Sequence, residues 1–174
     1  MTRQWIDDGL QRERDREEQQ RRALEQRHRE TSVIKEKGPA LMRELLAEAR
    51  AAIEEYRSKA RLNNEELRFE GLPHEGFCIA KTTLPKADLE CRPDYETHLL
   101  HISITHIDDR ESDPVESLYS WTFAVDDLNN VRLTRGTRTF RTMEEAVESL
   151  LKPVLFPLLD PPGQRDNLPT GQQS

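Results

Sequence analysis

Hydrophobic and polar residues divide this chain into two unlike parts. Residues 11–22 read QRERDREEQQRR and contain no apolar side chain, whereas from Pro39 onward apolar residues recur as they do in a core-forming sequence. A segment with nothing to bury cannot pack into a domain. The pattern therefore predicts a charged helical arm over residues 1–37, a single folded domain over residues 38–159 and a disordered tail over residues 160–174.

The arm places acidic residues four positions before basic ones, which is the order that favours ion pairs on an exposed helix. Trp5, Ile6 and Leu10 form a small apolar patch near its start. No heptad pattern persists over three repeats, as a coiled coil would require. We therefore expect a helix that stays solvated, docks through this patch on a protein partner or a second copy of the chain, or contacts nucleic acid. The predicted ion pairs are Asp8–Arg12, Glu17–Arg21, Glu18–Arg22 and Glu25–Arg29.

The folded part begins with a packed helix. Gly38-Pro39 is expected to interrupt the arm and to start this helix, because proline suits the first turn of a helix. Asn63-Asn64 is expected to end it, since asparagine tolerates the left-handed conformation of a helix stop. One face of the helix is apolar and is predicted to be buried, and it comprises Leu41, Leu45, Ala49, Ala52, Ile53, Tyr56 and Ala60.

From Leu67 the spacing of apolar residues shifts from 3.6 towards 2, which indicates strands. Short polar connections favour antiparallel neighbours. A second helix follows Thr142, whose hydroxyl group is predicted to form a capping box with the Glu145 carboxylate. The sequence thus predicts an α+β fold in which an N-terminal helix, an antiparallel meander of five or six strands and a C-terminal helix share one core. The predicted strands span residues 67–72, 76–84, 87–92, 97–107, 117–126 and 131–135.

Side chains alternate between two faces along the predicted strands. One face of the sheet is apolar, and both helices are expected to cover it. The other face is wet and could form a polar pocket wall or, with an acid such as Asp108, the start of a hydrolytic site, although no nucleophile-elbow glycine pattern supports the second reading. The candidate ligand-facing residues on this wet face are His101, Ser103 and Thr105, which alternate with Leu100, Ile102 and Ile104.

Composition and charge narrow the class of protein. Apolar residues make up 34% of the chain, charged residues another 34%, and the net charge is −7. Residues 1–37 hold ten Lys or Arg and nine Asp or Glu, which leaves sixteen basic and twenty-four acidic residues, a net charge of −8, on residues 38–174. An acidic body disfavours nucleic-acid and anionic-membrane surfaces. Two cysteines and the lack of a long apolar stretch favour a soluble cytoplasmic protein.

No metal or cofactor site is predicted. His98, His101 and His106 fall on one predicted strand, but His98 and His106 would lie about 26 Å apart along it. His101 would point to the opposite face from His98, so the three side chains cannot share one ion.

Cys78 and Cys91 are expected to be free thiols. They lie on a predicted hairpin around Pro85-Lys86, in which Ala80 rather than Cys78 sits opposite Cys91. The two sulfur atoms would then be too far apart for an unstrained disulfide.

A weak signal for anion binding comes from residues 134–138, which read Thr-Arg-Gly-Thr-Arg. This run is predicted to be a hairpin turn around Gly136, with Arg135 and Arg138 as the candidate anion contacts. No glycine-rich phosphate loop accompanies it.

The sequence carries no catalytic signature and assigns no catalytic residue, which favours a non-enzymatic protein. The leading hypothesis is a protein-interaction or adaptor module whose arm engages a protein partner or a second copy of the chain. The alternative is a small-ligand-binding or hydrolytic domain that uses the wet face of the sheet. A third reading is nucleic-acid binding through the arginines of the arm, which the nearly balanced charge of the arm weakens.

Overall fold

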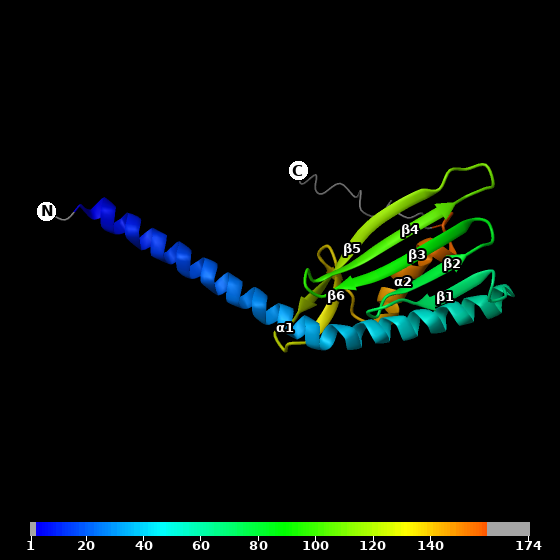
Figure 1. Ribbon diagram of the computed structural model, residues 1–174, viewed down its shortest axis with the longest axis horizontal. Coiled ribbons are helices and arrows are strands. Elements are labelled where there is room, and N and C mark those ends of the chain that lie inside the picture. Colours follow the sequence, from blue (N-terminus) through cyan, green and yellow to red (C-terminus); the bar gives the residue numbers. More distant parts are fainter. Residues whose placement is uncertain (1–2, 160–174) are drawn as a thin grey trace, which may run out of the picture.

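The computed structural model describes residues 3–159. It contains a long helix, one antiparallel sheet and a second helix, which confirms the predicted α+β fold. The seven strands lie in the sheet in their order along the chain, so the sheet is a simple meander (Figure 1). The elements are α1 (Gln4–Ala60), β1 (Leu67–Gly71), β2 (Phe77–Lys81), β3 (Lys86–Asp94), β4 (Leu99–Ile107), β5 (Val115–Val125), β6 (Val131–Arg135), β7 (Arg138–Thr139) and α2 (Met143–Leu155).

The hydrophobic core lies between one face of the sheet and the two helices. Alternate residues of β4 are buried and face the helices, as the period of two predicted. The opposite face, here called the open face, carries the intervening polar residues, and no described helix covers it (Figure 1). The core residues with at most 3% exposed surface include Ile34, Met42, Leu45 and Ile53 of α1, Leu100, Ile102, Ile104, Trp121 and Phe123 of the sheet, and Leu150, Leu151 and Val154 of α2.

The predicted interruption at Gly38-Pro39 is wrong, because α1 runs without a break from Gln4 to Ala60. Gly38 serves a packing role instead. A Cβ atom at this position would lie 2.9 Å from two ring carbons of Tyr95, so glycine is what allows the ring to reach the helix. Pro39 is accommodated inside the helix, and Figure 1 shows α1 changing direction in this region.

The core also extends into the segment 1–37. Ile34 is completely buried and belongs to the core cluster. Figure 1 shows that the N-terminal half of α1 projects away from the sheet, whereas the C-terminal half lies along it. One helix therefore forms both the projection and a wall of the core.

The end of α1 also differs from the prediction. Arg61, not an asparagine, takes the left-handed conformation, with φ of 56°, and its N–H is directed at the carbonyl groups of Arg57 and Ser58. Asn63 acts one step later, where its Oδ1 accepts hydrogen bonds from the backbone N–H groups of Glu65 (2.8 Å) and Glu66 (2.9 Å). This turn directs the chain from α1 into β1.

The C-terminal part follows the prediction more closely. Gly136, with φ of 58°, forms the turn between β6 and β7, where Arg135 lies opposite Arg138. The two residues of β7 are too few to produce a readable alternation, which is why the sequence predicts only six strands. Thr142 caps α2 by accepting a hydrogen bond from Glu145 N–H (3.2 Å), but the Glu145 carboxylate accepts from Arg141 N–H rather than from Thr142.

The cysteines are free, as predicted, but the predicted register of their hairpin is wrong. Cys78 lies opposite Glu90, whereas Cys91 lies opposite Phe77. Cys91 therefore points into the core and Cys78 towards the open face. The difference arises because the connection between β2 and β3 spans residues 82–85 rather than a two-residue turn.

We predict that Gly38→Ala destabilises the protein by about 1–3 kcal/mol, because the new methyl group overlaps the ring of Tyr95. Gly9→Ala is the matched control, since its Cβ would meet no atom within 4 Å and alanine favours a helix. Urea denaturation of both variants measures the difference. Equal stability of the two variants would show that Tyr95 moves aside without cost.

Candidate interaction surfaces

The projecting part of α1 presents apolar side chains to solvent. Trp5 is 70% exposed, Ile6 39% and Leu10 47%. We call these three residues the arm patch. Leu24 is a fourth exposed apolar residue, farther along the projection. Between them the surface is polar, and the predicted pair Glu18–Arg22 is present with 2.5 Å between the carboxylate oxygen and the guanidinium nitrogen.

Two turns of the sheet hold α1 where the projection meets the body. The Thr31 hydroxyl group lies 2.7 Å from His98 Nε2 and donates to the Arg27 carbonyl group, so it accepts its second hydrogen bond from the imidazole. His98 lies in the turn before β4, with φ of 63°, so the prediction that it belongs to a strand is wrong. Lys37 Nζ donates to the Asn129 carbonyl oxygen (2.6 Å) in the turn between β5 and β6.

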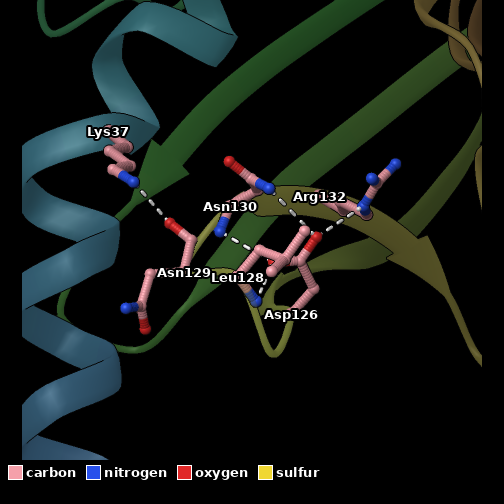
Figure 2. A network of polar contacts seen from close by, with 6 residues as sticks. All are labelled: Lys37, Asp126, Leu128, Asn129, Asn130 and Arg132. Atoms are coloured by element: carbon pink, nitrogen blue, oxygen red, sulfur yellow. Dashed lines mark hydrogen bonds and ion pairs between the residues drawn. The ribbon is translucent and has the colours of Figure 1, made fainter.

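The turn that carries Asn129 is itself organised by Asp126 (Figure 2). One oxygen of the Asp126 carboxylate accepts hydrogen bonds from Leu128 N–H (3.0 Å) and Asn130 N–H (2.8 Å), and the other accepts from Arg132 Nε (3.1 Å). These bonds, above all that from the Asn130 backbone, hold the pKa of Asp126 below its ordinary value. The Asp126 carboxylate thus fixes the turn whose Asn129 carbonyl group binds Lys37 of α1.

The candidate ligand-facing residues His101, Ser103 and Thr105 all lie on the open face, as predicted. Ser103 Oγ donates to a Glu116 carboxylate oxygen at 3.4 Å, and Ser120 Oγ lies 3.5 Å from His101 Nδ1. Both distances are at the long limit of a hydrogen bond.

A shallow hollow of about 270 Å³ lies over this part of the open face. His101 and Ser103 line it together with the exposed side chain of Leu118, whereas Thr105 does not. The hollow is open to solvent, and nothing in its lining excludes water from the pair formed by His101 and Ser120. Such a site offers polar contacts without the enclosed environment that strengthens catalytic interactions.

The two candidate anion contacts are both engaged within the chain. The Arg135 guanidinium group lies 5.5 Å from the centre of the Tyr119 ring and 3.5 Å from Ser149 Oγ. Arg138 forms an ion pair with Glu145 at the start of α2. These contacts attach the β6–β7 turn to α2 and β5.

Two ionisable side chains are buried near one end of the core: Lys81, which the sequence did not single out, and His106, which the sequence placed on a strand with His98 and His101. Lys81 is 7% exposed, and burial lowers its pKa. His106 is 9% exposed; its Nδ1 has no hydrogen-bond partner among the described residues, and its Nε2 lies 3.7 Å from an Asp108 oxygen. Burial likewise raises the pKa of Cys78 and Cys91, so both thiols are weak nucleophiles.

Within residues 3–159, no three His, Cys, Asp or Glu side chains come close enough together to hold a metal ion. None of the described helices combines the length and the apolar character needed to cross a membrane. Comparisons with protein-family models, with curated proteins and with solved structures find no match for this chain. The surfaces themselves are therefore the basis for any functional assignment.

We predict that Asp126→Ala accelerates hydrogen exchange at the amides of Leu128 and Asn130 and lowers the urea midpoint, because the turn loses its central acceptor. Asp127→Ala is the control, since it removes the neighbouring exposed carboxylate but none of the hydrogen bonds accepted by Asp126.

The same variant gives a pH test. Because the folded-state pKa of Asp126 is lowered, its contribution is complete above the ordinary pKa of about 4 and is lost as pH falls through the lowered value. The stability difference between the wild-type protein and Asp126→Ala should therefore shrink in strong acid. A difference that is constant with pH would exclude this role for the carboxylate.

Proposed function

We propose that this protein is a non-enzymatic interaction module, in which the folded body holds the arm and the arm captures a protein surface. The observation that carries the proposal is the exposure of Trp5, Ile6 and Leu10 at the far end of a helix that projects from the body (Figure 1). Aromatic anchors supply much of the binding energy of protein interfaces.

The polar stretch that follows the arm patch adds little to the stability of the projecting helix by itself. Exposed ion pairs on a helix are each worth about 0.2–0.5 kcal/mol, and an isolated helix is marginally stable in water. Burial of the arm patch against an apolar site would stabilise the projecting turns as well as the complex. The partner surface is therefore expected to be apolar and to accept a helix.

The alternative, a small-ligand-binding or hydrolytic domain, has one observation in its favour, which is the hollow beside His101 and Ser103. Its shallow, open shape suits a weak polar contact better than catalysis. Nucleic-acid binding through the arm has less support, because ten basic residues in segment 1–37 are opposed by nine acidic ones.

We predict that replacing Trp5 and Leu10 with alanine abolishes partner capture and any self-association through the arm. Changing Arg21 and Arg22 to glutamine should leave both nearly intact, because these exposed side chains contribute little. Light scattering measures self-association, and capture from native lysate with mass-spectrometric identification measures partner binding, each at low and high salt.

A nucleic-acid function predicts the reverse order of the two variants, with binding that falls steeply as salt rises. If neither pair of substitutions changes association or capture, the arm is a passive solvated helix and the proposed function is wrong.

A further inference from the structure

A second surface, independent of the arm, lies at the outer edge of β1. This strand is the first in the sheet, and within residues 3–159 it has a hydrogen-bonded neighbouring strand, β2, on one side only. The opposite edge of the sheet ends in β7, which has two residues, whereas β1 has five. β1 is thus the longer of the two edges, and an unpaired edge is a ready template for another strand.

The hydrogen-bond pattern shows which residues of β1 face outward. Thr82 N–H donates to Glu66 O, and Leu72 N–H donates to Gly76 O, so residues 66 and 72 turn their polar groups towards β2. In an antiparallel pair this direction alternates along the strand. Leu67, Phe69 and Gly71 therefore direct their N–H and C=O groups away from the sheet.

Part of this edge is already occupied. Arg57 donates two hydrogen bonds to Leu67 O, at 3.1 and 2.7 Å, and Leu67 N–H donates to Asn63 O. Phe69 lies beyond these contacts. A groove of about 250 Å³ runs beside it and is lined by Arg50, Ile53, Glu54 and Arg57 of α1, by Asn64, and by Arg68, Phe69 and Glu70 of β1.

We propose that β1 pairs with β1 of a second copy, antiparallel and about a two-fold axis at Phe69, so that two sheets join edge to edge. In this register the backbone groups of the two Phe69 residues face each other and can exchange both hydrogen bonds, whereas Leu67, whose backbone groups already bind Arg57 and Asn63, adds none to the pairing.

Charge complementarity selects this occupant. Arg68 and Glu70 are both exposed on the open face, on either side of Phe69. The two-fold register sets Arg68 of each copy opposite Glu70 of the other, which gives two cross-strand pairs of opposite charge. On the covered face the Phe69 ring is held within each copy, stacked on Phe77 with 5.3 Å between the ring centres and with Arg50 5.1 Å from its centre. The edge is thus complementary to itself, as a two-fold interface requires.

The test uses the full chain and sedimentation equilibrium at several concentrations. Glu70→Arg or Arg68→Glu alone puts like charges opposite each other in both pairs and should raise the dimer dissociation constant about tenfold or more. The double variant Arg68→Glu/Glu70→Arg restores opposite charges in the same register, so its dissociation constant should return to near the wild-type value.

Asp88→Arg is the matched control, because it makes the same change of charge at an exposed open-face position two strands from the edge. It should leave dimerisation nearly unchanged, and urea denaturation checks that every variant is folded. A wild-type chain that stays monomeric, or a double variant as weak as the single ones, would overturn the proposal. A dimer lost on changing Trp5 and Leu10 to alanine but indifferent to the β1 substitutions would place association on the arm and also overturn it.

Discussion

Burial of one apolar stripe of α1 against the sheet is the interaction on which the rest of this structure depends. The stripe runs from Ile34 to Ile53, and its members are completely shielded from water. Because the same helix continues towards its N-terminus, the packing that closes the core also sets the direction of the projection. The turns that contact Thr31 and Lys37 reinforce that direction at the point where the helix leaves the body.

The two faces of the sheet have different surroundings. One face packs against α1 and α2 and forms the hydrophobic core. The open face and the edge of β1 carry exposed side chains, as does the projection. An assembly in which β1 edges join and both projections stay free would present two arm patches at once, which raises the effective concentration of the second contact after the first forms.

The sequence predicted the structure correctly where a repeating pattern of apolar residues packs against a single neighbouring layer. The alternation around Ile102 predicted both faces of β4, and the exposed patch at Trp5 could be read from the polar run that follows it. It was uninformative where the outcome depends on a distant partner. Gly38 resembles a helix break until Tyr95 is known to pack on it, and the strand register at Cys78 follows from a connection whose length no local pattern fixes. The position of Phe69 on an edge strand was missed for the same reason, since a strand can be placed at an edge only once the sheet order is known.

Because α1 is continuous, the number of residues in the polar run determines where the arm patch lies relative to the body. From Leu10 to Thr31 the helix rises about 30 Å, and each residue turns it by about 100°. The individual polar side chains along this stretch can be exchanged with little effect on the backbone. The number of residues cannot be changed in the same way. Deleting two residues would move the arm patch to nearly the opposite side of the helix, whereas deleting seven would shorten the helix and leave the patch facing almost the same direction. The length of the polar run therefore sets both the distance of the arm patch from the body and the direction in which the patch faces.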